Sequence, residues 1–348
     1  MVIGDYQQVI YIAFVNECRW GWGVVIDDVK VTGMSAKSIT TWSNEVVKGN
    51  TFMTEGSWNE TANWSRESLP TENDYVVISA NAKVDDKVEA KVKYMQINEG
   101  VSLTVDNGGL LAVNDKIVNE EASSLILNDG GQILQTNQDI PATFVMNVSA
   151  PTSWEAENNT DGWQFIALPM KDISVSVIDP IYYEYDLFKY DGTQKGLQWV
   201  NFKNPEHSDL EQTFQQGSGY LASYEYNTTA RFTGNLNHET SFDFSDALSY
   251  NADDDYANFH LLGNPFTFDM DITKATFTNM VNGVAIITSE GGYDYSQTTI
   301  PVGDAFFVQA NGNDYNSSLS YGGRGARSEK SNSLNITATG NAGKDNVV

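Results

Sequence analysis

The stretches that decide the fold of the middle of the chain are Leu103-Thr104-Val105-Asp106-Asn107-Gly108-Gly109-Leu110-Leu111 and Leu125-Ile126-Leu127-Asn128-Asp129-Gly130-Gly131-Gln132-Ile133. They lie 22 residues apart, and their Gly-Gly pairs align. Each unit reads as a short strand, a polar glycine turn and another strand, so its apolar positions can stack on those of the next unit. The repeat predicts a short β-solenoid module, which we place at residues 49–140.

Two tryptophan motifs precede this repeat, Gly56-Ser57-Trp58 and Asn63-Trp64-Ser65. Together with the coils that follow, they resemble a stalk-like module that is common in large bacterial surface proteins. The resemblance implies a structural or spacing role for this part of the chain.

A longer and more divergent repeat occupies residues 151–323. Trp163-Gln164-Phe165-Ile166-Ala167-Leu168-Pro169 is echoed by Phe259-His260-Leu261-Leu262-Gly263-Asn264-Pro265-Phe266, and Gly217-Ser218-Gly219-Tyr220-Leu221-Ala222 by Gly303-Asp304-Ala305-Phe306-Phe307-Val308. The motifs follow the same order in both halves, with a further strand between them. This order predicts an antiparallel β-sandwich with two related halves. The segment also resembles an uncharacterised β-domain that precedes the C-terminal sorting signal of bacterial surface proteins.

Residues 1–34 carry two apolar strands, Val9–Phe14 and Val24–Val31, joined by a turn that contains Trp20-Gly21-Trp22-Gly23. Two strands do not make a stable core, so we expect them to be the end of a domain that starts upstream. These residues, with Ile26-Asp27-Asp28-Val29-Lys30-Val31-Thr32-Gly33, resemble the C-terminal end of a cleaved-adhesin (MAM-like) jelly-roll domain. That family occurs in gingipain-type proteases and haemagglutinins.

The resemblance implies a jelly-roll fragment that binds host proteins or carbohydrate and often carries a structural Ca²⁺ ion. It points to Asp27 and Asp28 as the metal ligands of this chain, with most other ligands upstream. The alternative is that one aspartate caps the strand end and the other faces water. No Cys/His cluster or EF-hand loop offers another metal site in the sequence.

Composition agrees with an all-β surface protein. Helical periodicity is nearly absent, and short apolar runs alternate with Gly, Asn, Asp and Ser clusters. Lys and Arg number 20 against 46 Asp and Glu, giving a formal net charge of −26. Such a surface repels phosphate backbones, so we expect no nucleic acid partner. The sequence has no apolar run long enough to span a membrane.

The sequence does not favour catalysis, and we expect the chain not to be an enzyme. Cys18 would need a histidine to act as a nucleophile, but His207, His238 and His260 are far away in sequence. No Gly-x-Ser-x-Gly motif is present. A glycan-active hydrolase would need two carboxylates facing each other in a cleft, and nothing in the sequence marks such a pair.

Two tyrosine-rich stretches suggest carbohydrate binding. Tyr182-Tyr183-Glu184-Tyr185-Asp186 and Tyr220-Leu221-Ala222-Ser223-Tyr224-Glu225-Tyr226 place aromatic rings beside hydrogen-bond acceptors. Exposed rings stack on sugars, and neighbouring carboxylates accept hydrogen bonds from hydroxyls. The alternative is that these rings form the core or pair across strands.

Residues 324–348 read as a linker followed by the start of a further β-domain. The glycine-rich segment that contains Arg324 and Arg327 is either a spacer or a site of proteolytic processing. Ser333–Ala338 reads as a strand.

Three functions remain open. We expect a non-catalytic adhesion or interaction segment of a larger secreted bacterial protein, extracellular or at the cell surface, whose partner is a host or matrix protein or a carbohydrate. A purely structural stalk or spacer is the alternative, and a glycan-active hydrolase is the third.

Overall fold

The computed structural model describes residues 39–42, 56–154, 161–192, 198–204, 212–248, 258–281, 283–311, 318–321, 338–340 and 343–345. Over these ranges the chain is all-β, which confirms the predicted fold class. Its helices are short 3-10 turns: η1 (Thr61–Asn63), η2 (Ala122–Ser124), η3 (Val175–Ile178), η5 (Ser245–Ala247) and η6 (Ile272–Lys274). None of the described helices has the length and apolar character that a membrane span requires.

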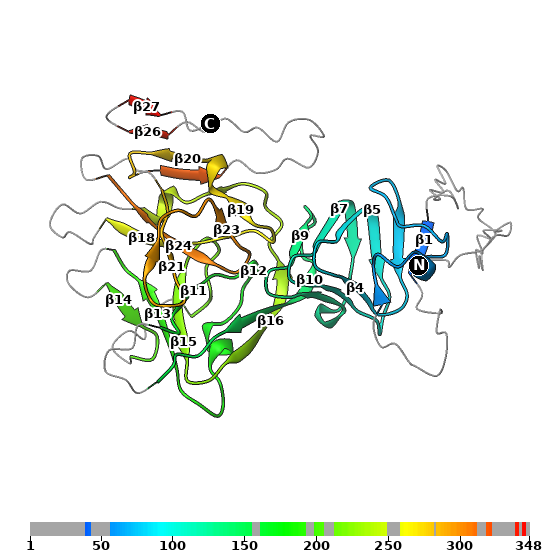
Figure 1. Cartoon of the computed structure of the whole chain (residues 1–348), viewed down its shortest axis with the longest axis horizontal. Coiled ribbons are helices and arrows are strands. Elements are labelled where there is room, and N and C mark those ends of the chain that lie inside the picture. Colours follow the sequence, from blue (N-terminus) through cyan, green and yellow to red (C-terminus); the bar gives the residue numbers. More distant parts are fainter. Residues whose placement is uncertain are drawn as a thin grey trace, which may run out of the picture.

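A β-solenoid of about three coils forms one end of the molecule (Figure 1). One of its walls is a parallel sheet in the order β1-β3-β5-β7-β9, with β1 at Ile39–Trp42, β3 at Tyr75–Ile78, β5 at Glu89–Ile97, β7 at Leu110–Val118 and β9 at Gln132–Leu134. The other wall contains β2 (Gly56–Ser57), β4 (Ala82–Val84), β6 (Leu103–Val105) and β8 (Leu125–Leu127).

The strand register confirms the repeat that the sequence predicts. Leu103–Val105 of β6 lie beside Leu125–Leu127 of β8, and Leu110–Ala112 of β7 lie beside Gln132–Leu134 of β9. In each pair the identical positions of two successive repeats become neighbours. Their apolar side chains point inward, so Leu103, Val105, Leu125 and Leu127 are fully buried.

A third coil, at Ala82–Val92, is missed by the sequence repeat. Its strand β4 pairs with β6 at Ala82↔Leu103, and β5 pairs with β7 at Glu89↔Leu110. Lys87 stands where the other coils have glycine, and its φ of 61° matches the 75° of Gly108 and Gly130. A lysine in a left-handed conformation disguises the turn, because glycine is the residue expected there.

Polar side chains of the turns bond between coils. Asn128 Nδ2 of one turn donates to Asp106 Oδ1 of the preceding turn at 2.7 Å. The Lys83 ammonium forms an ion pair with Asp106. Asp129 Oδ2 accepts from the backbone N–H of Asn147. The turns therefore add cross-coil contacts to the stacked apolar core.

Two tryptophans close the outer end of the solenoid core. Trp58 and Trp64 are buried, their rings pack edge to face at 4.7 Å, and Trp64 Nε1 donates to the Trp58 carbonyl. Both rings belong to the same buried cluster as the apolar side chains of the coils.

β10 (Pro141–Val148) joins the solenoid to the rest of the molecule. It pairs in parallel with β8 on one side and in antiparallel with β16 (Thr228–Leu236) on the other. β16 also pairs with β12 (Met170–Lys171), so one seven-stranded sheet runs in the order β12-β16-β10-β8-β6-β4-β2. The sequence places a module boundary between residues 140 and 151, and this sheet passes through it.

The antiparallel region, Pro141–Tyr321, contains the two related halves that the sequence predicts. In the first half β11 (Gln164–Ile166), β15 (Tyr220–Tyr224), β13 (Tyr185–Tyr190) and β14 (Trp199–Asn201) form a sheet in that order. In the second half β18 (Phe259–Gly263) pairs with β24 (Ala305–Gln309). Ile166↔Tyr220 in one half corresponds to Leu262↔Phe306 in the other.

The contacts between the halves come in pairs that are related by a local two-fold axis. The Ala167 N–H donates to the Gly303 carbonyl at 2.7 Å, and the Gly263 N–H donates to the Gly217 carbonyl at 2.9 Å. The isolated bridges Ile166↔Asp304 and Ser218↔Leu262 are related in the same way. Each half therefore uses the same edge to bind the other.

Smaller strands complete this region. They are β17 (Phe242–Asp243), β19 (Met270–Asp271), β20 (Ala275–Thr278), β21 (Ile286–Ile287), β22 (Tyr293–Asp294), β23 (Thr299–Ile300) and β25 (Ser318–Tyr321). β26 (Ala338–Gly340) adds to β20 in parallel, and β27 (Gly343–Asp345) pairs with β26. The jelly-roll fragment expected at residues 1–34 lies outside the described residues, as does most of the expected linker.

Candidate functional site

The two tyrosine-rich stretches meet on neighbouring strands. Tyr185, at the start of β13, pairs with Tyr224, at the end of β15. Tyr183 packs against Tyr224 and Tyr226, and Tyr182 precedes it in the sequence. We call this group the tyrosine surface; it comprises Tyr182, Tyr183, Tyr185, Tyr224 and Tyr226.

The inner rings of the tyrosine surface are anchored. Tyr224 is 1% exposed, and its hydroxyl donates to the Ile178 carbonyl at 2.6 Å. The hydroxyls of Tyr183 and Thr228 share a hydrogen bond of 2.6 Å. Burial raises the pKa of Tyr224 far above its ordinary value, so the phenol stays neutral. These rings form a firm base rather than a contact surface.

The outer rings face solvent. Tyr182 is 89% exposed and Tyr226 is 58% exposed. Tyr226 packs edge to face against Tyr183 at 5.4 Å, which holds one outer ring against the anchored base. The apolar side chains of Val177 and Ile181 are exposed close by in the sequence. Packing therefore accounts for the inner tyrosines, whereas the outer tyrosines are exposed and carbohydrate binding by them stays a prediction.

Charged groups surround these rings. Lys203 lies 5.0 Å from the Tyr185 ring centroid, and its ammonium donates to the Tyr185 carbonyl and to the Glu184 carboxylate. Burial raises the pKa of Tyr185, and the negative charges of Asp179, Asp186 and Glu184 add to the effect. The surface thus offers ring faces, carboxylate acceptors and one cation.

This arrangement can bind a neutral ligand. Neutral sugar rings or apolar protein side chains can pack against the exposed tyrosines, while carboxylates accept hydrogen bonds from hydroxyls or amides. Among the described residues no group of three or more His, Cys, Asp or Glu is placed to hold a metal ion.

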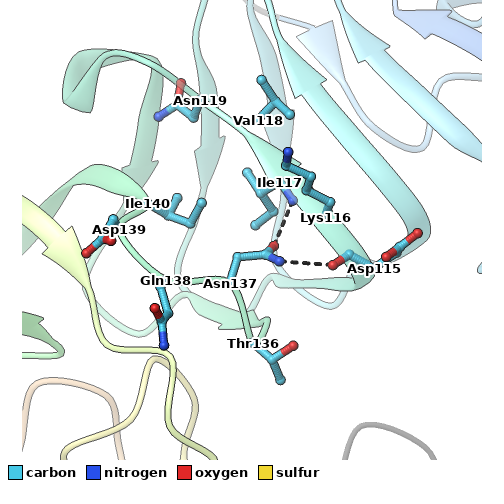
Figure 2. A pocket seen from close by; sticks show the side chains of 10 residues that line it. All are labelled: Asp115, Lys116, Ile117, Val118, Asn119, Thr136, Asn137, Gln138, Asp139 and Ile140. Atoms are coloured by element: carbon cyan, nitrogen blue, oxygen red, sulfur yellow. Dashed lines mark hydrogen bonds between the residues drawn. The ribbon is translucent and has the colours of Figure 1, made fainter.

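A separate open groove of about 710 Å³ lies on the solenoid (Figure 2). Its walls are the end of β7 from Asp115 to Val118, the next residue Asn119, and the segment from Thr136 to Ile140. Asn137 spans the groove: its Oδ1 accepts from the Ile117 N–H at 2.7 Å, and its Nδ2 donates to the Asp115 carbonyl at 2.9 Å.

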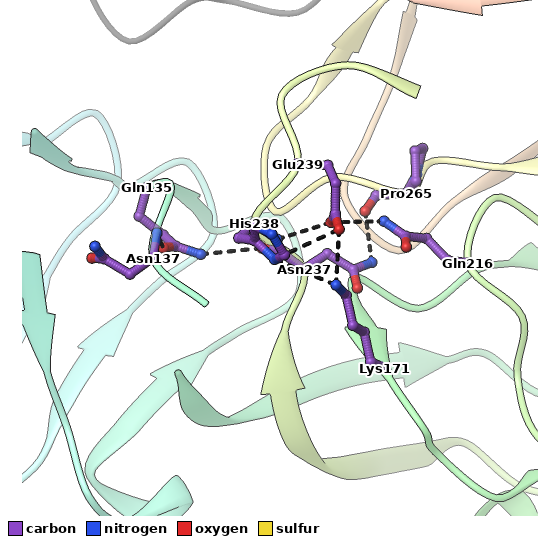
Figure 3. Close-up of polar contacts among 8 residues, drawn as sticks. All are labelled: Gln135, Asn137, Lys171, Gln216, Asn237, His238, Glu239 and Pro265. Atoms are coloured by element: carbon purple, nitrogen blue, oxygen red, sulfur yellow. Dashed lines mark hydrogen bonds and ion pairs between the residues drawn. The ribbon is translucent and has the colours of Figure 1, made fainter. Parts of the chain in front are cut away.

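A polar network connects this segment to the antiparallel region (Figure 3). Gln135 Nε2 donates to the Asn237 carbonyl, and Asn237 Nδ2 donates to the Pro265 carbonyl. Beside them Lys171 forms an ion pair of 2.8 Å with Glu239. Burial alone would raise the pKa of Glu239, but hydrogen bonds, above all the one from Lys171, lower it to about 2. The network is structural, because its donors and acceptors bond mostly to each other.

Three carboxylates also approach one another where the solenoid meets the antiparallel region. Burial raises the pKa of Asp304 to about 7, and the negative charges of Asp129 and Asp269 contribute. Asp269 accepts from Gln132 Nε2 and from the Val302 N–H. Sequence reasoning missed this group because its members lie in three unrelated turns.

The other residues singled out by sequence are dispersed. Asp27, Asp28, Cys18 and His207 lie outside the described residues, so Ca²⁺ binding by the two aspartates stays a prediction. His260 is buried on β18, and His238 lies beside Lys171 and Glu239. Asn137 has no sequence signal of its own, since it is one polar residue in a polar loop.

Comparison with known families gives one match. The family model described as "Domain of unknown function (DUF8693)" matches residues 49–338. Neither the curated proteins nor the solved structures contain a match to this chain. The matched range includes the solenoid and the antiparallel region, which the seven-stranded sheet joins.

Proposed function

We propose that this chain, which belongs to the DUF8693 family and whose match covers the solenoid and the antiparallel region together, is a non-catalytic adhesion segment of a larger secreted bacterial protein. It acts outside the cell or at the cell surface. The tyrosine surface contacts the partner. The solenoid acts as a spacer between this surface and the rest of the parent protein.

The partner we propose is a neutral carbohydrate chain. The observation that carries this choice is the exposure of the Tyr182 and Tyr226 rings, which have Glu184 and Glu225 as near neighbours in the sequence. Ring faces stack on the C–H faces of sugars, and carboxylates accept hydrogen bonds from sugar hydroxyls. A net charge of −26 disfavours anionic polysaccharides and nucleic acids.

Immobilised polysaccharides test this proposal. A mannan and a neutral β-glucan are presented to the whole chain by surface plasmon resonance. We expect the double variant Tyr182→Ala/Tyr226→Ala to lose tenfold or more in affinity. Tyr295→Ala is the matched control, because Tyr295 is 72% exposed and lies in the other half of the antiparallel region. An equal loss in the control, or no binding to either glycan, contradicts the proposal. Binding only to a collagen surface would replace the glycan by a matrix protein.

A structural stalk is the second candidate, and one observation favours it. The core of the solenoid continues without a break into the antiparallel region, from Trp58 to Phe232 and Val302. Such continuity suits a stiff spacer. In that case the tyrosine variants would leave every partner of the parent protein bound as before.

A further inference from the structure

The solenoid sheet is incomplete at one edge. β5 and β7 are each nine residues long, whereas β9 has three residues. β9 pairs only with Leu110–Ala112 of β7. Among the described strands, the rest of β7 is therefore paired on the β5 side alone.

Three local features direct the chain out of the solenoid after β9. Gln135 turns inward, is buried and bonds to Asn237 of the antiparallel region. Asp139 adopts a left-handed conformation with a φ of 55°, and β10 starts soon after in the other sheet. Asn119 Nδ2 donates to the Pro141 carbonyl and so holds this new direction. The groove is the space that a full-length β9 would fill.

The side chain of Asn137 imitates a residue of the missing strand. In a parallel pair, each bonded residue donates its N–H to one carbonyl of the neighbour and accepts at its own carbonyl from the N–H two residues later. Asn137 makes this pair of bonds, to the Asp115 carbonyl and from the Ile117 N–H. The edge of β7 is therefore competent for strand addition, and one side-chain amide covers it.

The charge around the groove indicates which kind of peptide strand could pair with the edge of β7. Among the residues that line the groove, Asp115 and Asp139 are exposed acids and Lys116 is an exposed cation. Glu120 and Glu121, which are also exposed, follow the lining residue Asn119 directly in the sequence. A second copy of the chain would bring its own charge of −26. A basic peptide would instead meet an acidic rim.

We propose that the free half of β7 binds an extended basic peptide segment of a partner protein, which adds to the solenoid sheet in place of the Asn137 side chain. Main-chain hydrogen bonds supply affinity in such strand addition, and alternate side chains supply selectivity. This site is independent of the tyrosine surface.

A labelled eight-residue peptide of alternating Lys and Val tests the site by fluorescence anisotropy with the whole chain. Two further peptides carry N-methyl groups on alternate amides, in one phase or the other. Only one edge of an added strand faces β7, so we expect one methylated peptide to lose at least tenfold in affinity and the other to bind as the parent does. Equal binding by both would overturn the proposal, as would absence of binding by the parent peptide.

Protein variants provide the second arm. Asn137→Ala uncovers the edge, so the parent peptide should bind it about tenfold more tightly. Gln138→Ala, the matched control in the same wall, should bind like the wild type. In Asn137→Ala, where the Ile117 amide has lost the Asn137 acceptor, hydrogen exchange should show protection of this amide only when the peptide is bound. Weaker binding by Asn137→Ala, or a peptide-independent dimer in sedimentation that occupies the same edge, would contradict the inference.

Discussion

The solenoid and the antiparallel region are both built from internal repeats, but they repeat by different operations. In the solenoid one coil is translated onto the next, as the pairing of β6 with β8 shows. In the antiparallel region one half is related to the other by a local two-fold rotation, as the paired contacts of Ala167 and Gly263 show. A translated repeat always ends on an unpaired face, whereas a two-fold repeat closes on itself.

The buried cores of the solenoid and of the antiparallel region also differ in composition. The buried hydrophobic side chains of the solenoid between Val76 and Ile133 are Ala, Val, Leu, Ile and Met95, without an aromatic ring, and such compact residues suit coils that stack in register. The antiparallel region buries phenylalanines, among them Phe144, Phe232, Phe266 and Phe306. Large rings fill the uneven space between strands that approach from distant parts of the sequence. The free edge of β7 is a consequence of the translated repeat.

The largest effect is expected where the two regions meet. Phe144 on β10 is fully buried and stacks on Phe232, so Phe144→Ala should lower the free energy of unfolding by about 3–5 kcal/mol. If the regions form one cooperative unit, amides of β5 and of β18 should lose hydrogen-exchange protection together.

Val76→Ala is the control for that experiment, because Val76 is buried in the solenoid far from β10 in sequence. In one cooperative unit it also lowers the protection of β18. Loss of protection confined to β5 would divide the molecule into two independently stable regions.

A smaller effect tests the two-fold relation. A Cβ at Gly263 would lie 2.5 Å from the Ala167 Cβ and 2.4 Å from the Ser218 carbonyl oxygen. Gly263→Ala should therefore cost about 1–3 kcal/mol in urea unfolding. Adding Ala167→Gly, which exchanges the two residues across the axis, should recover part of the loss. A double variant less stable than the sum of the singles would contradict this geometry.

The smallest expected effect tests whether Lys87 occupies the turn position that glycine has in the other coils. Lys87 has the backbone conformation of Gly108 and Gly130 at the equivalent turns. A left-handed non-glycine residue costs about 1–2 kcal/mol, and glycine loses about 0.5–1 kcal/mol through chain entropy. Lys87→Gly should thus stabilise the chain by about 0.5–1 kcal/mol, measured by the urea midpoint. Lys87→Ala, which keeps the strained conformation, should give no such gain.

Sequence reasoning recovered features whose signal is local. The Gly-Gly turns revealed two coils, and the motifs around Pro169 and Pro265 revealed the two halves. The coil at Ala82–Val92 escaped because Lys87 conceals its turn. The double role of β10 could not be predicted, since pairing between Pro141 and Asn235 is set by distant packing.

The candidate sites show the same division. The tyrosine stretches stand out in the sequence, yet which rings are exposed depends on neighbours such as Ile178 and Thr228. The role of Asn137 depends on where β9 ends, which no local pattern specifies.

The double pairing of β10 also has a mechanical consequence. The strand is paired with β16 over all eight of its residues and with β8 at Thr143 and Phe144. Sliding the solenoid past the antiparallel region along this strand loads these hydrogen bonds in shear, so that they must break together. Peeling the strand away would break them one at a time. The shared strand therefore resists a pull along its own axis far better than a pull across it.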